Sequence, residues 1–434
     1  MNERDEDGAT RPARTRAVVL HPHLKSERHD EAALAGKVEE AAGLARAIDL
    51  DVAHAEPVAL SSWRPSTLVG EGTVERLKGL IAEEHVGLAI IDRALSPIQQ
   101  RNLEKAWSCK VIDRTGLILE IFGARARTAE GRLQVELARL TYQRGRLVRT
   151  WTHLERQRGG RGFLAGPGET QLEADKRIIA DKIERLKIQI EDVKRTRGLH
   201  RRARSRVPYP VVSLVGYTNA GKSSLMRALT GSEVYVADKL FATLDTTVRT
   251  LHPPTAPKVL VSDTVGFIKK LPHDLVASFR STLDEAREAT LLMHVVDGSD
   301  PAWPSHYEVT REVLAEIDAG DIDRLLVINK VDRISEADRA TLAAQHPDAV
   351  LLSAKDPADV ARLREVILAR MESQMEEATL RVPFGRERVL PTIHESCRVL
   401  EEDWDEEGGR FRVKALPEAL ARLLAALGEG KKGG

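Results

Sequence analysis

The segment that most constrains the fold is VVSLVGYTNAGKSSL, residues 211–225, where a β-branched apolar run meets a helical one. The two are joined by Gly216-x-x-x-x-Gly221-Lys222-Ser223, which is the spacing of a P-loop. In such a loop, backbone N–H groups at a helix N-terminus bind phosphate, the lysine reaches the β and γ oxygens, and the serine hydroxyl binds Mg²⁺. The segment therefore predicts a strand, a phosphate-binding turn and a helix of an α/β domain, without distinguishing ATP from GTP.

Two later motifs decide which nucleotide the site takes. VLVSDTVG places Asp263 at the end of an apolar strand, where its carboxylate holds Mg²⁺ through water and the Gly266 N–H bonds the γ-phosphate. LLVINKVD places Asp332 where it accepts from guanine N1–H and the exocyclic amine, an edge that adenine lacks. Asn329 is expected near N7 and O6, and Lys330 over the base. The nucleotide is therefore predicted to be guanine, and its pocket is closed by Ser353, Ala354 and Lys355.

The stretch FATLDTTVRT, between these motifs and the P-loop, is predicted to be a nucleotide-dependent switch. One of its threonines should bind Mg²⁺ through its hydroxyl only when the γ-phosphate is present. Thr243, which lies 20 residues after Ser223, is the first candidate and Thr247 is the alternative. Thr246 and Thr250 are interpreted as ordinary polar residues of the loop.

These motifs define the full set of predicted site residues. The expected catalytic groups are Lys222, Thr243 and Gly266, and the expected Mg²⁺ ligands are Ser223, Thr243 and, through water, Asp263. The predicted nucleotide-binding residues are Gly216, Tyr217, Thr218, Asn219, Ala220, Gly221, Lys222, Ser223, Ser224, Phe241, Ala242, Thr243, Leu244, Asp245, Asp263, Thr264, Val265, Gly266, Asn329, Lys330, Val331, Asp332, Ser353, Ala354 and Lys355.

Two positions within these motifs have consequences of their own. Phe267 follows Gly266 where many GTPases carry a glutamine that orients the attacking water. Because a phenyl ring cannot do this, intrinsic hydrolysis is predicted to be slow, with a partner or another residue completing the site. Asn219 has two interpretations, as a ligand for K⁺ near the phosphates or as a turn residue.

Ahead of the P-loop, two heptad seams predict an antiparallel helical hairpin. Between them lies GGRGFLAGPG, residues 159–168, with five glycines and a proline in ten residues, which no helix interior would tolerate. A helix is expected to begin again over residues 169–175. The seams themselves are Leu133, Leu137, Leu140, Leu147, Trp151 and Leu154 in the first helix, and Ile179, Ile183, Leu186, Ile190 and Val193 in the second.

Charge is unevenly distributed along the chain. Lys plus Arg and Asp plus Glu each number 66, which excludes a diffuse polycation, yet residues 139–206 hold 19 basic and 8 acidic residues. Acidic compensation occurs elsewhere, as in EEDWDEE at 401–407. A solvated coiled-coil face is the alternative to RNA binding, although such a face usually mixes its signs. RNA contacts are predicted at the glycine-rich tip, through Arg156, Arg158, Arg161 and Phe163.

The complete prediction is an α/β fold with four structured parts in a chain of 434 residues. Two distant cysteines indicate a reducing, cytoplasmic setting, and a polar start without an apolar run indicates no membrane partner. We expect a monomer. The parts are a disordered start (1–16), an α/β domain with a parallel sheet (17–128), the basic helical hairpin (129–205), a P-loop GTPase domain (209–377) and a small α+β tail domain (378–434). In the tail, strand-like TLRVPF and RFRVKAL alternate with helices over 386–401 and 418–427.

The joint pattern resembles the HflX family of translational GTPases over nearly the whole chain. The hairpin with its glycine-rich tip ahead of the GTPase domain is more specific than the P-loop alone. One departure is Thr246, where the family often has proline after LFATLD. The motifs that carry the resemblance are LSPIQQRNLE, DRTGLILEIFGARARTAEGRLQVELARL, RQRGGRGFLAGPGETQLEADKR, GYTNAGKSSL, LFATLD, DTVGF and NKVD.

The resemblance implies a function that composition alone does not show. In this family the N-terminal part and hairpin bind the large ribosomal subunit and its rRNA, and some members split stalled ribosomes under stress. We therefore expect a GTP-hydrolysing protein that requires Mg²⁺ and binds this subunit. Two alternatives stay open: a GTP-regulated RNA-remodelling protein, and a regulator that docks on a protein partner through its coiled coil.

Overall fold

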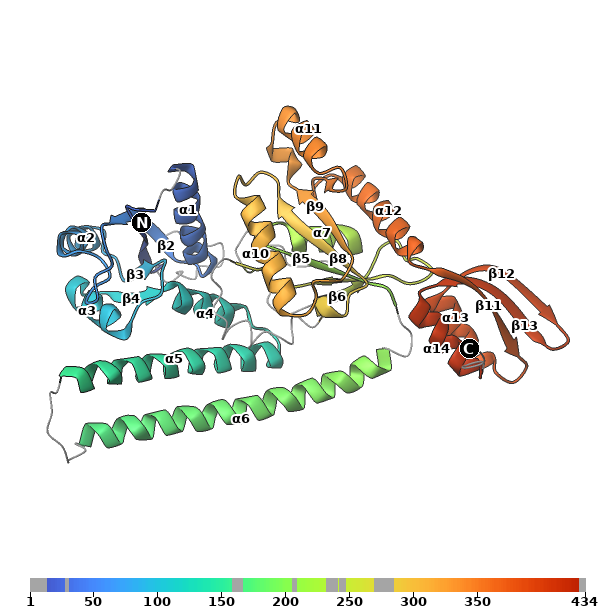
Figure 1. The fold of residues 1–434 in the computed structure, drawn as a ribbon, viewed down its shortest axis with the longest axis horizontal. Coiled ribbons are helices and arrows are strands. Elements are labelled where there is room, and N and C mark those ends of the chain that lie inside the picture. Colours follow the sequence, from blue (N-terminus) through green and yellow to red (C-terminus); the bar gives the residue numbers. More distant parts are fainter. Residues whose placement is uncertain are drawn as a thin grey trace, which may run out of the picture. The chain divides into compact units, whose positions relative to one another are not determined.

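The computed structural model describes residues 14–27, 31–157, 167–204, 209–231, 241, 247–268 and 285–428. Side chains are described throughout these ranges except at 32, 147–157, 167–172, 194 and 196–204. The chain divides into two compact units, one running to Ile190 and including Phe241, the other beginning at Glu191. Each unit is described by itself, and Figure 1 gives the element labels.

The first unit is built on a four-stranded parallel sheet in the order β2-β1-β3-β4. Strands and helices alternate along the sequence, which confirms the predicted α/β fold. Buried apolar residues of β1 and β3 pack with Leu77 and Ile81 of α2 and Leu103 of α3 to form its core. The elements are β1 (Arg16–Leu24), α1 (Glu31–Ala47), β2 (Asp51–Leu60), α2 (Glu71–Glu83), β3 (Leu88–Ile91), α3 (Pro97–Trp107), β4 (Lys110–Asp113) and α4 (Arg114–Arg125).

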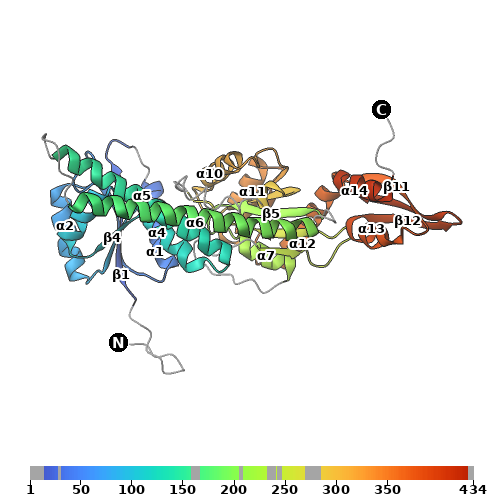
Figure 2. The ribbon, with the colours of Figure 1, turned by 90° about the horizontal axis from the view of Figure 1, so that it is seen from below.

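Two long helices follow this sheet, α5 (Ala129–Gln157) and α6 (Pro167–Arg204). Figures 1 and 2 show α5 and the first part of α6 lying side by side and antiparallel, as the seams predict. Three seam positions, Leu140, Ile183 and Ile190, are buried. Helix α6 begins at Pro167, inside the stretch predicted to be the tip, because proline is compatible with the first turn of a helix. Of the predicted RNA contacts, Arg158, Arg161, Phe163 and the Arg156 side chain lie outside the described residues.

The second unit contains a six-stranded sheet in the order β10-β9-β8-β5-β7-β6, parallel except for β6. Leu214 and Met293 lie on the face that packs against α7 and α12. His294 and Val296, which alternate with Met293 along β8, face α10 on the other side. The elements are β5 (Val211–Gly216), α7 (Lys222–Thr230), β6 (Thr247–Thr250), β7 (Leu260–Asp263), β8 (Leu291–Asp297), α10 (Trp303–Glu316), β9 (Arg324–Asn329), α11 (Glu336–Gln345), β10 (Val350–Leu351) and α12 (Pro357–Ser373).

The C-terminal part of this unit differs from the prediction. Its antiparallel sheet has three strands, in the order β11-β13-β12, packed on α13 and α14. The helix predicted over 386–401 is confirmed in its first part and wrong at its end, because α13 ends at Ser396 and the acidic stretch that follows pairs with β13 as a strand. Glu401 opposes Arg412 in that pairing and forms an ion pair with it at 2.6 Å. The elements are β11 (Glu376–Pro383), α13 (Leu390–Ser396), β12 (Arg398–Asp405), β13 (Gly408–Ala415) and α14 (Pro417–Leu427).

Within the described residues, none of the helices combines the length and the apolarity that crossing a membrane requires.

Candidate nucleotide site

The turn between β5 and α7 has a backbone that requires its glycines. Gly216 has φ +146°, and a Cβ there would lie 2.1 Å from the Val295 carbonyl oxygen. Gly221 has φ +99°, and a Cβ would lie 2.1 Å from Nδ2 of Asn329. Asn219 is exposed with φ +61°, a left-handed conformation that asparagine tolerates and that accounts for its place in a turn. A role for Asn219 in binding K⁺ stays a prediction.

Lys222, the first residue of α7, lies beneath this turn. Its Nζ donates to the carbonyl oxygens of Gly216 at 2.9 Å and Tyr217 at 2.7 Å, so the ammonium group is held at the loop. Burial lowers the pKa of Lys222 to about 8, against an opposing effect of the nearby Asp263 carboxylate. A Cβ at Gly266 would lie 3.1 Å from this Nζ and closer still to Thr218. Glycine at 266 therefore keeps the space above the ammonium group open.

Two oxygen donors meet beside the loop. The Ser223 hydroxyl donates to the Asp263 carboxylate at 2.7 Å, and Asp263 is fully buried at the end of β7. A hydroxyl and a carboxylate are hard oxygen ligands, the class that Mg²⁺ prefers. The donors therefore fit the ion that the P-loop pattern implies. Thr243, the third predicted ligand, lies outside the described residues, and the alternative, Thr247, begins β6.

The P-loop is braced on its outer side by aromatic rings. The ring of Tyr217 stacks on His306 of α10 with centroids 3.8 Å apart and planes 7° apart, and His306 faces Asp300 at 3.4 Å. The backbone of Phe267 closes onto the loop, accepting from the Thr218 N–H at 2.8 Å and donating to Gly216 at 3.1 Å. The Phe267 ring is 1% exposed, so it takes no part in orienting water. Sequence reasoning did not identify His306, which no motif marks.

The base-recognition residues meet at the ends of β9 and β10. The Ser353 hydroxyl donates to Asp332 at 2.8 Å, and the Lys355 ammonium lies 3.5 Å from the second carboxylate oxygen. Burial acts to raise the pKa of Asp332, but these two partners lower it below its usual range. Asp332 is therefore charged at neutral pH and able to accept two N–H groups from a guanine edge. The Ser353 backbone N–H is held by Asp359, a residue that the motifs did not indicate.

Asn329 was predicted to lie near N7 and O6 of the base, and that contact stays a prediction. In the structure its amide bridges two protein loops. Nδ2 donates to the Ala220 carbonyl at 2.9 Å, and Oδ1 accepts from the Ala354 N–H at 3.0 Å. Asn329 is 1% exposed, so it joins the phosphate loop to the base loop from inside the protein. Lys330 is positioned by an ion pair with Asp297 at 2.7 Å, another partner that the motifs did not reveal.

The remaining predicted residues have varied positions. The Thr264 hydroxyl donates to the Leu214 carbonyl at 2.6 Å, and Val331 is buried in the protein. Phe241 belongs to the first unit, where its ring, 2% exposed, meets Phe122 of α4 edge-on with centroids 4.8 Å apart. A contact of Phe241 with the nucleotide stays a prediction. Ala220 is buried beside Ser224 at the start of α7, Val265 is buried, and Ala242, Leu244 and Asp245 lie outside the described residues.

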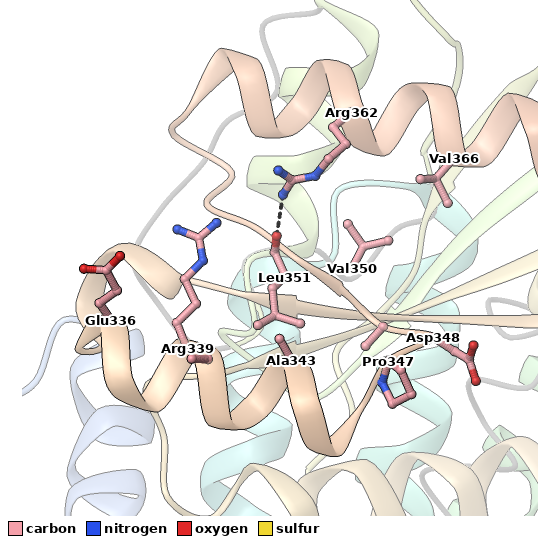
Figure 3. Close-up of a pocket in the computed structure, with 11 residues that line it drawn as sticks. Glu336, Arg339, Ala343, Pro347, Asp348, Val350, Leu351, Arg362 and Val366 are labelled. Carbon is pink, nitrogen blue, oxygen red and sulfur yellow. Dashed lines mark hydrogen bonds between the residues drawn. The ribbon is translucent and has the colours of Figure 1, made fainter.

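A groove of about 670 Å³ opens elsewhere in the second unit, between α11, β10 and α12. Figure 3 shows Arg362 reaching across it to donate to the Leu351 carbonyl at 2.6 Å, which satisfies an edge-strand acceptor. None of the predicted nucleotide-binding residues lines this groove.

Comparison with known proteins identifies the family. Models of a GTP-binding GTPase N-terminal region, a GTP-binding GTPase middle region and a 50S ribosome-binding GTPase match residues 35–123, 125–204 and 211–330. GTPase HflX of Gluconacetobacter diazotrophicus is 50% identical over 394 residues, 90% of this chain and 86% of the relative. The relatives named GTPase HflX in Magnetococcus marinus and Escherichia coli are 45% and 44% identical, covering 89% and 81% of this chain and 89% and 82% of the relatives.

The chain belongs to the HflX family. This confirms the resemblance carried by the hairpin and GTPase motifs, and it establishes the protein as a GTP-binding enzyme that hydrolyses GTP. In this HflX GTPase the site residues follow strands of one sheet. The P-loop follows β5, Asp263 ends β7 and Asp332 follows β9, so all three lie at the carboxyl ends of these strands.

Proposed function

We propose that this GTPase binds the large ribosomal subunit through its basic hairpin and, in its GTP state, splits or rescues stalled ribosomes. The observation that carries the proposal is the distribution of charge along the hairpin. Residues 139–161 hold seven basic residues and one acidic residue, and residues 194–206 hold seven basic residues and none that is acidic. Such one-signed clusters bind phosphate backbones.

The middle of α6 has a different character and supplies an internal control. Residues 173–193 hold five basic and six acidic residues. Some of them pair along the helix, as Lys187 does with Glu184 at 2.8 Å. This stretch has the mixed signs of a solvated face, so RNA contacts belong to the two flanking clusters and not to the whole arm.

In the GTPase site, we propose that the chain's own groups divide the work as follows. Lys222 neutralises charge on the β and γ oxygens, the Gly266 N–H bonds the γ-phosphate, and Asp332 selects guanine. When bound by Ser223, Asp263 and Thr243, Mg²⁺ supplies further neutralisation of phosphate charge. Because the buried Phe267 cannot orient water, the intrinsic rate is slow and the ribosome completes the site.

Sedimentation of ribosomes with the full chain and GTP, GDP or a non-hydrolysable GTP analogue tests the proposal. We expect co-sedimentation with the large subunit in GTP and the analogue, and faster GTP turnover when this subunit is added. Arg158→Gln with Arg161→Gln should weaken binding. It should also reduce the slope of log affinity against log salt by the amount that up to about two phosphate contacts contribute. The matched control, Lys182→Gln with Lys187→Gln in the mixed-sign stretch, should leave both unchanged.

Two results would contradict the proposal. Equal losses in the tip and control variants would show that position along the hairpin is irrelevant, and a weak salt response would favour docking on a protein. Turnover that the large subunit does not raise would refute partner-completed hydrolysis.

A further inference from the structure

The C-terminal sheet exposes two large aromatic rings that the GTPase site does not use. Phe384 is 58% exposed and Trp404 is 49% exposed, and their ring centroids are 6.2 Å apart. We call this pair the C-terminal aromatic patch. It lies on the face of the sheet that α13 and α14 cover, because Trp404 opposes Gly409, which shares the face of the buried Phe411. Figure 1 shows the strands extending beyond these two helices, so this end of the face is bare.

The indole of Trp404 is held in a fixed position. Its Nε1 donates to Glu402 at 3.0 Å, and its ring meets Phe411 edge-on at 5.8 Å. A Cβ at Gly409 would lie 3.1 Å from the indole and 2.7 Å from Phe411. The absence of a side chain at 409 therefore lets the ring lie against the strand. An indole fixed on one side and open on the other is prepared to receive a ligand, because little side-chain entropy remains to be lost.

The surroundings of the patch are acidic. Residues 401–407 contain six carboxylates and no basic side chain, against three arginines at facing positions on β11 and β13. By the strand register, Glu402 shares the face of Trp404, whereas Glu401, Asp403 and Asp405 lie on the other face of this strand end. Arg381 is engaged by Asp405 at 2.8 Å and Glu407 at 2.9 Å. Among the described residues, Asp403 and Glu406 form no ion pair. The local field is therefore negative.

From this combination we propose that the C-terminal aromatic patch docks an arginine- and lysine-rich segment of a partner protein. Tryptophan is the best face for a cation, and nearby carboxylates add attraction for the same group. Exposed rings also stack on nucleic-acid bases, but Glu402 beside the indole and the net negative charge of this strand end repel a phosphate backbone, so the charge favours a basic protein segment. This surface and its partner class go beyond the proposed RNA contacts of the hairpin.

Fluorescence anisotropy with the full-length protein and a fluorescein-labelled octapeptide of alternating Arg and Lys tests the proposal. Trp404→Ala, which keeps every carboxylate, should weaken binding about fivefold, the factor that one partly desolvated cation–π contact provides. Glu402→Gln, which keeps an acceptor for the indole N–H but removes the charge on the face of the patch, should weaken binding and flatten its salt dependence. The matched control Leu400→Ala, also on β12 and 36% exposed, should stay within twofold of the parent.

Further measurements distinguish a lost contact from a misfolded domain. Trp404→Phe keeps a ring against Gly409. Its loss of affinity should be less than half of the loss caused by Trp404→Ala. Thermal unfolding followed by circular dichroism should be unchanged in Leu400→Ala and Trp404→Phe. Equal peptide affinity of the parent and Trp404→Ala would overturn the proposal, as would no measurable peptide binding. Tryptophan-dependent binding of a twelve-nucleotide RNA in preference to the peptide would also overturn it.

Discussion

Asn329 provides the sharpest test of how the site is assembled. Replacing it by alanine removes two hydrogen bonds at once, to Ala220 at 2.9 Å and from Ala354 at 3.0 Å. The buried Ala220 carbonyl would then lack a partner, which costs about 1–3 kcal/mol. Loss of the bond to the half-buried Ala354 N–H costs about 1 kcal/mol, because water can partly replace it. If nucleotide binding requires both loops in place, the loss of about 2–4 kcal/mol weakens GDP binding at least about thirtyfold.

The assay is equilibrium titration of a fluorescent GDP derivative, competed with GDP and with 7-deaza-GDP. An asparagine that bridges loops predicts that Asn329→Ala weakens both nucleotides by the same factor. An asparagine that contacts N7 predicts that the parent discriminates against 7-deaza-GDP and that the variant does not. Asn102→Ala is the matched control, because Asn102 makes one exposed bond to the Ser66 carbonyl in the first unit. A loss under threefold in Asn329→Ala would refute the bridge, and lost discrimination would add a contact to N7.

Four further outcomes follow from the charged and titratable side chains of the protein. The pKa of Lys222 is about 8 in the nucleotide-free protein, and bound phosphate raises it. GDP affinity should therefore fall above pH 8, by at most tenfold per pH unit. Calorimetry in two buffers should detect the proton that is taken up on binding. Burial lowers the pKa of His294 to about 3, so stability should fall as pH drops below 6.5, by up to about 1.4 kcal/mol per unit, and His294→Phe should flatten this slope in urea titrations. Arg114→Leu removes the arginine partner of the buried Asp92 and leaves it only the His21 ring, at 2.6 Å, among the side-chain contacts described. The first unit should lose up to about 3–5 kcal/mol of stability, seen as a lower thermal midpoint. Asp332→Asn should shift preference from GTP toward xanthosine triphosphate, because an amide N–H then faces the xanthine O2; retained strict GTP preference in a competition assay would mean that the base site is misassigned.

Local patterns were enough to predict the α/β alternation and the order of the nucleotide motifs. The strand before Gly216 and the helix after Lys222 follow from apolar periodicity and loop spacing, and both appear as predicted. The misread element was β12, whose acidic sequence has little strand character of its own. It becomes a strand because β13 supplies hydrogen bonds and arginine partners such as Arg412, and this pairing cannot be read from one segment.

The same limit explains Asn329. A motif states which residue types occur together, and it assigns roles by the ligand they surround, so an asparagine next to a guanine-binding aspartate is read as a base contact. The structure shows that an amide, with two N–H donors and one acceptor oxygen, also suits two loops that lack a common strand. One N–H and the oxygen satisfy the backbone of residues 220 and 354, more than a hundred positions apart in sequence. A residue inside a binding motif can therefore hold loops together besides any contact with the ligand, and only three-dimensional contacts reveal that second role.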